Sequence, residues 1–381
     1  MVRAAAISLA LAACGSPMSA PRDAPGAPDS APDAAGLDLT SQLAPIAAQY
    51  QLPAMAGIAA SDSAILGQGV TGVRKLGDPT PATLDDTWHL GSDTKAMTST
   101  LIAGYVEAGT LGWDEPLSQL FPGTTIDPGY QSVTLRMLLA HVGGAPADLP
   151  TAVEQVIAGP GTSRALRLQA VQMILAQPPG ATVGTYTYSN AGYMIAGAAL
   201  ELATNTAWED LMRAKLFAPL QMTSCGFGPN ATGTMVDEPW GHELENGTLV
   251  AVNLDNPPAL GPAGTVHCGL VDWLAFLREH LNGARGAPTV LGLQPATWTE
   301  LHTPYPGSAG SYALGWGVVT QSWTNGPALA HTGDNTFNVA DAWVVPGIDR
   351  IFVATSNRGD QPALDGANAA IVSEITEFLP Q

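Results

Sequence analysis

Basic residues are scarce in this chain of 381 residues. Lysine and arginine together number 14 against 33 aspartates and glutamates, which gives a formal net charge of -19 and a pI near 4.4. A surface this acidic repels phosphate backbones and anionic headgroups, so we exclude nucleic acid and an anionic membrane surface as electrostatic partners. Lysine itself occurs only at Lys75, Lys95 and Lys215. A motif that contains one of them is therefore of particular interest.

Several common catalytic and ligand-binding motifs are missing as well. The histidines show no H-E-x-x-H motif or similarly close spacing, so we predict no zinc site. No G-x-S-x-G segment occurs, which argues against the nucleophile elbow of an α/β-hydrolase esterase. The glycine-rich segment GPGTSR, residues 159–164, lacks the lysine of a phosphate-binding loop.

The amino terminus predicts export. Met1–Arg3 is a short basic start, and residues 4–13 form an apolar run that is too short to span a bilayer. The segment LAAC, residues 11–14, places small residues before Cys14 and resembles a bacterial lipoprotein signal. We therefore expect a signal peptide over 1–13, lipidation of Cys14, and a membrane-anchored protein that faces the periplasm or the cell exterior. An ordinary secretory signal with an incidental cysteine is the alternative.

Residues 14–38 are rich in proline, alanine, aspartate and serine and have no apolar period, which predicts a flexible linker before a folded domain over 39–381. Apart from Cys14, the chain contains only Cys225 and Cys268. In an oxidising compartment this pair can form a disulfide, and two buried free thiols are an equal alternative.

Apolar periodicity divides the folded part into two lobes. Strand-like runs near 54–70 and again over 312–357 predict one mostly antiparallel sheet made from both ends of the chain, and helical periodicity dominates between them. We predict an α/β (α+β) fold with a sheet lobe over about 39–114 and 305–381 and an inserted helical lobe over about 115–304. A buried helix over 92–108 should present its amino end where the lobes meet, a common place for ligand sites.

The segment GSDTK, residues 91–95, places a lysine three positions after Ser92, at the start of that helix. Ser92 and Lys95 then lie one turn apart on nearly the same face. A serine hydroxyl is a weak nucleophile until a neighbour takes its proton, and a desolvated lysine can do so. Taken alone, the motif is more often a helix cap beside a solvated lysine.

Two further motifs favour a catalytic role for Ser92 and Lys95 over a helix cap. The segment YSN, Tyr188–Asn190, precedes a predicted helix and is suited to present a phenol and an amide to a cleft. The segment HTG, His331–Gly333, lies at the end of a predicted strand. His141, in the segment LLAHVGG, is interpreted as a structural hydrogen-bonding residue rather than a ligand.

These motifs and their flanking segments occur in the order found in the β-lactamase-related serine hydrolases. The segments are residues 91–111, 133–144, 178–197, 207–228, 262–277 and 331–335. From about residue 40 to its end, the chain resembles this family, which includes class C β-lactamases, D-Ala-D-Ala carboxypeptidases and certain esterases. The resemblance implies a β-lactamase/transpeptidase-like fold and two-step acyl transfer, with no metal or organic cofactor.

The resemblance also implies a role for each motif residue. Ser92 would be the acylated nucleophile, Lys95 its activating partner, and Tyr188 the phenol that shuttles the proton. Asn190 would bind Lys95 and a substrate amide. His331, Thr332 and Gly333 would line the substrate site, and the backbone N–H groups of Ser92 and Asp334 would form the oxyanion hole.

One departure from the family pattern limits the substrate. β-Lactamases of this type usually carry Lys-Thr-Gly where this chain has His331–Gly333, and histidine is mostly neutral near pH 7. We therefore expect an exported serine hydrolase that acts on a small ester or a D-amino-acid amide. The alternatives are a true β-lactamase or D,D-carboxypeptidase that acts on peptidoglycan-derived substrates, and a catalytically idle binding module of the cell envelope.

Overall fold

The computed structural model of the protein describes residues 36–308 and 311–380. The predicted signal peptide, Cys14 and most of the predicted linker lie outside the described residues. The linker prediction extends two residues too far, because Leu37–Asp38 forms strand β1 and pairs with β3. The backbone of these two residues completes the edge of the sheet.

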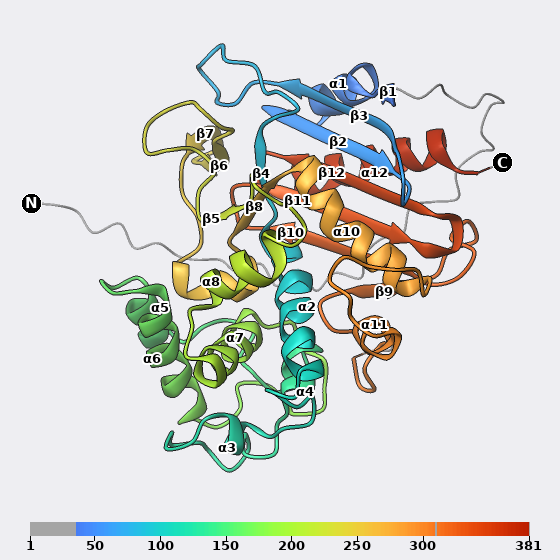
Figure 1. Cartoon of the computed structure of the whole chain (residues 1–381). Coiled ribbons are helices and arrows are strands. Elements are labelled where there is room, and N and C mark those ends of the chain that lie inside the picture. Colours follow the sequence, from blue (N-terminus) through green and yellow to red (C-terminus); the bar gives the residue numbers. More distant parts are fainter. Residues whose placement is uncertain (1–35, 309–310, 381) are drawn as a thin grey trace, which may run out of the picture.

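A seven-stranded sheet forms one side of the molecule, in the order β1-β3-β2-β12-β11-β10-β9 (Figure 1). Neighbouring strands are antiparallel, except that β1 runs parallel to β3. The central pairing joins β2 near the amino end to β12 near the carboxy end, which confirms the predicted sheet made from both chain ends. Its strands after β1 are β2 (Ala54–Ala60), β3 (Ile65–Gly72), β9 (Gly317–Val319), β10 (Ala328–Asp334), β11 (Val339–Val345) and β12 (Arg350–Ser356).

Both faces of the sheet are covered by helices. In β2, Ala56 and Ile58 point into the larger hydrophobic core, whereas Met55 and Ala59 point into a second core on the opposite face. This alternation follows the two-residue period of a strand. Helices α1 (Thr40–Gln49) and α12 (Gln361–Phe378) pack on the second face, and α10 (Leu270–Ala284) packs on the first face, against β2, β11 and β12.

Helix α2 (Thr94–Glu107) lies where the sheet meets the helical lobe (Figure 1). Every residue from Thr94 to Ala103 is buried, polar ones included. A helix surrounded on all sides is a rigid support for the residues at its amino end. The turn that precedes it, η1 (Gly91–Asp93), carries Ser92.

The helical lobe is formed mainly by short helices between β4 and β9. These are α3 (Leu117–Leu120), α4 (Leu135–Leu139), α5 (Thr151–Ile157), α6 (Ser163–Leu175), α7 (Asn190–Thr204), α8 (Trp208–Met212), α9 (Gly261–Gly264) and α11 (Pro295–His302). Further short turns are η2 (Arg213–Phe217), η3 (Pro258–Leu260) and η4 (Pro346–Ile348). In the described part of the chain, no helix combines the length and apolar character needed to cross a bilayer.

The region expected to be mainly helical also contains strands. A three-stranded sheet joins β4 (Thr87–His89), β8 (Val266–Gly269) and β5 (Gly226–Phe227), and β6 (Gly241–Glu245) pairs with β7 (Thr248–Val252). Most of these strands are too short for a clear two-residue period. The sequence Asn246-Gly247 is typical of a two-residue hairpin turn, and both residues adopt positive φ between β6 and β7.

Candidate active site

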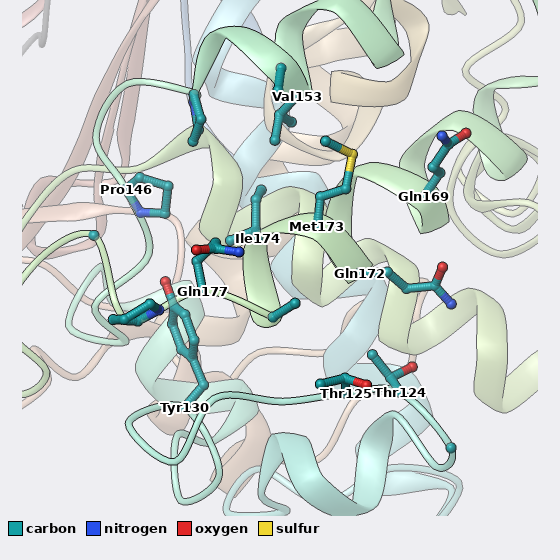
Figure 2. A pocket seen from close by; sticks show the side chains of 16 residues that line it. Thr124, Thr125, Tyr130, Pro146, Val153, Gln169, Gln172, Met173, Ile174 and Gln177 are labelled. Atoms are coloured by element: carbon teal, nitrogen blue, oxygen red, sulfur yellow. The ribbon is translucent and has the colours of Figure 1, made fainter.

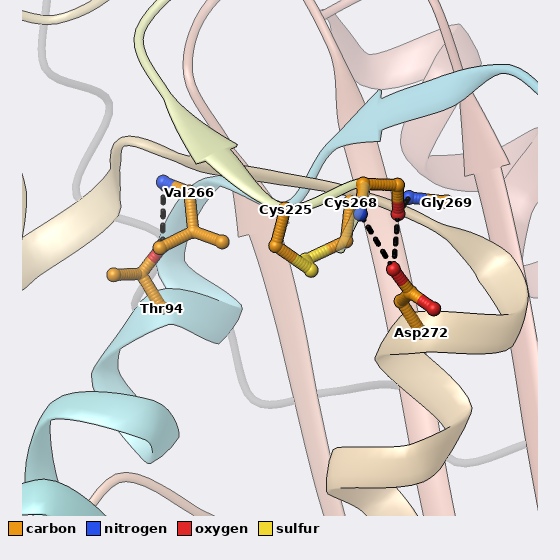
Figure 3. The surroundings of a disulfide bond; sticks show 7 residues. Thr94, Cys225, Val266, Cys268, Gly269 and Asp272 are labelled. Carbon is orange, nitrogen blue, oxygen red and sulfur yellow. Dashed lines mark hydrogen bonds between the residues drawn. A yellow bond between two sulfur atoms is a disulfide. The ribbon is translucent and has the colours of Figure 1, made fainter. Parts of the chain in front are cut away.

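Ser92 lies in a turn that is fixed on both sides to strand β8. The backbone N–H of Leu90 donates to Val266 O at 2.9 Å. The Val266 N–H donates to Thr94 Oγ1 at 3.2 Å (Figure 3). The α-helix therefore begins at Thr94 rather than at Ser92, and the serine belongs to the preceding 3-10 turn. Its side chain is partly exposed, whereas the residues on either side of it are buried.

Lys95 is fully buried, and its ammonium group points at the serine. Nζ donates to Ser92 Oγ at 2.9 Å, to Asn190 Oδ1 at 2.8 Å and to Ala263 O at 2.7 Å. These three oxygens come from the Ser92 turn, the start of α7 and α9. Lys95 is therefore not the solvated lysine expected if the Ser92 motif were only a helix cap.

Tyr188 and Asn190 reach the site from the amino end of α7. Ser189 caps this helix, since its Oγ accepts the Gly192 N–H at 3.2 Å and donates to Pro146 O at 2.6 Å. The ring of Tyr188 lies 4.7 Å from Lys95 Nζ. The structure thus brings Tyr188 and Asn190 to the Ser92–Lys95 pair across almost one hundred residues of sequence.

His141 supports this loop, as the sequence interpretation of a structural residue predicts. Its Nδ1 accepts the backbone N–H of Ser189 at 3.1 Å, and its ring centroid lies 4.3 Å from that of Tyr188. Burial lowers the pKa of His141 well below its ordinary value, and the charge of Lys95 lowers it further. His141 is therefore a neutral support on which the phenol ring of Tyr188 rests.

The opposite side of the site is formed by the end of β10. His331 is buried, and its Nε2 lies 3.0 Å from the hydroxyl of Tyr312. Burial, assisted by the charge of Lys95, lowers the pKa of His331 to about 3, whereas burial raises the pKa of Tyr312. The phenol therefore donates to a neutral imidazole, and this wall offers no cation at neutral pH.

The remaining residues of that segment lie along the strand. Thr332 pairs with Asp341 of β11 in the sheet register, and burial raises the pKa of Asp341 to about 7. Gly333 and Asp334 approach the turn that carries the serine. A Cβ atom on Gly91 would lie 2.6 Å from the Asp334 nitrogen, so only glycine allows the two backbones to come this close. The predicted oxyanion-hole donors, Ser92 N and Asp334 N, therefore belong to adjoining backbone segments.

Cys225 and Cys268 form a disulfide that joins β5 to β8 (Figure 3). Ser224, which precedes Cys225, donates from its N–H and hydroxyl to Asp272 Oδ2 at 2.7 Å and 2.6 Å. The disulfide is separate from the group formed by Ser92, Lys95 and Tyr188. It stiffens the small sheet whose strand β8 holds both sides of the Ser92 turn.

Three contributors to the site were not identified from the sequence. Ala263 acts through its carbonyl oxygen, which any residue could supply. Tyr312 is recognised from its contacts with His331 and with the ring of His141. Asp93, inside the GSDTK segment, lies 3.8 Å from His331 Nδ1, and its pKa is raised well above the ordinary value by burial and by the nearby Asp341. None of these residues belongs to a recognisable motif of its own.

A separate groove of about 840 Å³ lies in the helical lobe (Figure 2). Tyr130, Pro146, Val153, Met173 and Ile174 line it, and none of Ser92, Lys95 and Tyr188 does so. The hydroxyl of Tyr130 donates to Gly144 O at 3.0 Å, so its polar atom is already bonded. The volume of this groove therefore does not make it the candidate active site, which we place at the buried Lys95 and Ser92.

Comparison with known proteins gives a consistent family assignment. The family model described as Beta-lactamase matches residues 39–376. Penicillin-binding protein 4 of Amycolatopsis lactamdurans is 25% identical over 76% of this chain and 77% of its own length. The D-alanyl-D-alanine-carboxypeptidase/endopeptidase AmpH of Escherichia coli K12 is 24% identical over 67% of this chain and 71% of its own.

A solved structure shows the same fold. The D-stereospecific amidohydrolase from a Streptomyces species superposes with a TM-score of 0.67 at 22% identity, and the match covers 88% of this chain and 98% of that one. The fold is thus the β-lactamase/transpeptidase-like fold that the sequence motifs predict. The chain belongs to the β-lactamase family of serine hydrolases.

Proposed function

We propose that the protein is an exported serine hydrolase that forms an acyl-enzyme on Ser92 and acts on a small neutral ester or a D-amino-acid amide. The observation that carries this proposal is the contact of 2.9 Å between Ser92 Oγ and the fully buried Lys95 Nζ. Burial of a lysine is costly unless its charge is paired or used. Asn190 Oδ1 and Ala263 O, which also accept from this nitrogen, are uncharged oxygens.

The reaction proceeds in two steps. In the first, Ser92 Oγ bonds to the acyl carbon, its proton passes to the neutral amine of Lys95 along their contact, and the leaving group departs with a proton relayed by the phenol of Tyr188. The ammonium formed on Lys95 already has Asn190 Oδ1 and Ala263 O as acceptors. In the second step, water attacks the acyl carbon of the ester and gives up a proton to the same pair, and that proton passes to Ser92 Oγ as the bond between Oγ and the acyl carbon breaks.

The negative charge that develops on the acyl oxygen requires donors. The backbone N–H groups of Ser92 and Asp334 are proposed for this role, and the close approach of Gly91 to the Asp334 backbone supports it. Backbone amides fixed in this way need no reorganisation during the reaction.

The wall at His331 indicates the substrate class. A neutral imidazole bonded to a phenol cannot attract a carboxylate as a lysine would. This favours an uncharged ester or amide over a β-lactam, which carries a carboxylate. The structural likeness to a D-stereospecific amidohydrolase supports the amide of a D-amino acid as one such substrate.

A cell-wall D,D-carboxypeptidase is the second candidate, and its support comes from the relatives. Penicillin-binding protein 4 and AmpH, a carboxypeptidase/endopeptidase, both match about two thirds or more of the chain. Such an enzyme would bind peptidoglycan-derived peptides with the same serine. The two candidates therefore differ in substrate and not in mechanism.

Export and lipid anchoring at Cys14 are part of the proposal. The basic start, the apolar run and the LAAC segment support them, and the disulfide between Cys225 and Cys268 is typical of an oxidising compartment. Labelling cells with a fatty-acid analogue tests the anchor. The wild type should carry the label and a Cys14→Ser variant should not, whereas an unlabelled wild type would leave only an ordinary secretory signal.

Covalent labelling tests the hydrolase proposal. The full-length protein is incubated with a fluorophosphonate and separately with a fluorescent penicillin, and the intact mass is compared with that of a Ser92→Ala variant. We expect one fluorophosphonate adduct on the wild type and none on the variant. Persistent penicillin labelling would favour the carboxypeptidase, rapid nitrocefin turnover would favour a β-lactamase, and labelling by neither reagent would favour an idle binding module.

A further inference from the structure

A buried polar cluster lies behind the two backbone amides proposed for the oxyanion hole. It consists of His89 at the end of β4, Asp255 in the loop after β7, and Asn335 directly after β10. The side chains of His89 and Asp255 are 1% and 2% exposed, and Asn335 is 2% exposed. The proposed reaction uses none of the three side chains directly.

The three side chains meet at one carboxylate oxygen. His89 Nε2 lies 2.9 Å from Asp255 Oδ1, and Asn335 Nδ2 donates to the same oxygen at 3.0 Å. The Asn256 N–H donates to it at 2.7 Å, which fixes the loop that carries Asp255. A buried carboxylate needs polar partners, and two of these three, His89 and Asn335, come from elements far away in the sequence.

Each outer member of the cluster holds one side of the oxyanion hole. His89 Nδ1 accepts the backbone N–H of Gly91 at 3.0 Å, and Gly91 directly precedes Ser92. Because Nδ1 accepts this bond, the imidazole proton is on Nε2, the atom that lies 2.9 Å from Asp255 Oδ1 without hydrogen-bond geometry. The cluster thereby fixes Gly91 in its positive-φ conformation, with φ of 48°.

The other side is the end of β10. Asn335 follows Asp334, and its Oδ1 accepts the backbone N–H groups of Phe337 at 3.2 Å and Asn338 at 2.9 Å. Asn335 therefore holds the turn after the strand, while its amide nitrogen links that turn to Asp255. Any shift of Asp255 would move Gly91 and Asp334 relative to one another.

We propose that His89, Asp255 and Asn335 are positioning residues that set the separation between the Ser92 and Asp334 amides. This inference rests on the proposed acyl transfer at Ser92 and names the device that aligns its oxyanion hole. The carboxylate acts as a brace between two backbone segments. It does not contact the reacting atoms, so its effect should appear in the transition state and not in substrate binding.

The test compares an ester with the matched thionoester, in which sulfur replaces the carbonyl oxygen and accepts hydrogen bonds poorly. For the wild-type protein, p-nitrophenyl acetate and its thiono analogue are measured as kcat and KM. Asp255→Ala should lower kcat on the oxygen ester by about tenfold to a hundredfold, with KM changed by less than about threefold. The preference for oxygen over sulfur should fall by a similar factor, because the thionoester benefits little from the amides.

Two further variants separate positioning from general damage. Asp255→Asn keeps an oxygen that can accept from both His89 and Asn335, so it should recover most of the lost preference. Asn335→Asp keeps the Oδ1 bonds to the turn but places a second carboxyl against Asp255, and should lose the preference even if Asp255→Ala does not fold. Asn253→Asp is the matched control. Asn253 lies in the same loop as Asp255, but its side chain donates to Ala231 O and Gly233 O, between β5 and β6.

The outcomes are distinguishable. If Asp255→Ala and Asn335→Asp slow both substrates equally and leave the oxygen preference intact, the cluster is merely structural and the inference is wrong. An equal loss in Asn253→Asp would also overturn it. If the wild type turns over neither ester and takes no fluorophosphonate at Ser92, the proposed hydrolase function has failed instead.

Discussion

On the helical-lobe side of Ser92 the groups proposed to act are side chains, whereas on the sheet side the groups proposed to bind the negative charge are backbone amides, beside the His331 wall. The first side presents Tyr188 and Asn190 from the start of α7, with Lys95 between them and the serine. The second presents the end of β10, which packs directly on Gly91. The proposed proton transfers belong to the first side, and the proposed stabilisation of negative charge belongs to the second.

The two sides are also supported differently. Tyr188 rests on the ring of His141, and its loop is capped by Ser189, so the support is local to segments that carry recognisable motifs. The amides of the sheet side depend on the contacts of His89 and Asn335 with Asp255. Both partners are distant from Asp255 in the sequence, Asn335 by 80 residues and His89 by more than that. A side chain that takes part in the reaction can be mutated directly. A backbone amide can be tested only by mutating the residues that hold it in place.

The largest effect is expected from Lys95→Met, which keeps the length of the side chain and removes the amine. We expect kcat on a neutral ester to fall by about a thousandfold or more, because Ser92 loses its proton acceptor. Steady-state kinetics with p-nitrophenyl acetate measures this. Lys215→Met is the matched control, since Lys215 is exposed on η2, and an equal loss in that variant would contradict the assignment.

Tyr188→Phe is expected to have the next largest effect. The ring and its packing on His141 remain, but the hydroxyl is gone, so kcat should fall by about a hundredfold while KM changes little. Tyr130→Phe serves as the control, because it also removes a phenol hydroxyl, in this case a buried one that donates to Gly144 O. The control should lose about 1 kcal/mol of unfolding free energy and retain activity. Full activity in Tyr188→Phe would exclude the proposed relay.

Gly91→Ala acts on the sheet side. Its new Cβ would meet the Asp334 nitrogen at 2.6 Å, so the two donor segments must move apart and kcat should fall by a few tens to about a hundredfold. Gly109→Ala introduces the same kind of substitution at φ of 73°, but meets no atom within 4 Å. Both variants should lose roughly 1 kcal/mol of stability through backbone strain, Gly91→Ala should lose more because of its clash, and only Gly91→Ala should lose activity. Similar kinetics for the two would show that the close approach has no catalytic consequence.

The smallest effect on rate is expected from His331→Gln, which keeps a neutral acceptor for Tyr312. With a pKa of about 3, His331 is neutral from pH 5 to 8, so the variant should stay within about tenfold of the wild type and retain the same pH-rate profile there. A new inflection or a large rate loss would indicate that the imidazole is charged during catalysis.

The same variant should alter acid stability. An unfolded histidine binds a proton near pH 6.5, but the folded protein does not protonate His331 until about pH 3, so this group stabilises the fold above pH 6.5 and the contribution is lost as pH falls toward 3. His331→Gln should therefore reduce the slope of unfolding free energy against pH by about 1.4 kcal/mol per unit in that range. Urea titrations at pH 7 and pH 5 measure the difference. Equal slopes would contradict the lowered pKa.

The extent of sequence prediction follows the same division between side chains and backbone. Ser92, Lys95, Tyr188 and His331 lie in short motifs with a fixed order, and the two-ended sheet follows from strand-like runs at both ends of the folded part. The positions of these motifs in the fold could therefore be anticipated. The start of α2 at Thr94 could not, because the 3-10 turn depends on the bonds of Leu90 and Thr94 to β8.

Backbone and loop contributions left no comparable signal. The carbonyl of Ala263 has no identity in the sequence, and Asp255 lies in a loop with no catalytic motif. Its role emerges only when His89 and Asn335 are brought to it by β4 and β10. Strands β4, β5 and β8 were missed for a related reason, since two to four residues cannot display a period and their pairing is decided by tertiary contacts.

The central claim is that Ser92 becomes acylated during turnover. The wild-type protein is quenched in acid while it hydrolyses p-nitrophenyl acetate, digested, and the acetyl group is located by peptide mass spectrometry. The account predicts an acetyl group on the Ser92 hydroxyl, present in the wild type and absent from Lys95→Met. Acetylation confined to any other residue, or turnover with no acyl intermediate on Ser92, would contradict it.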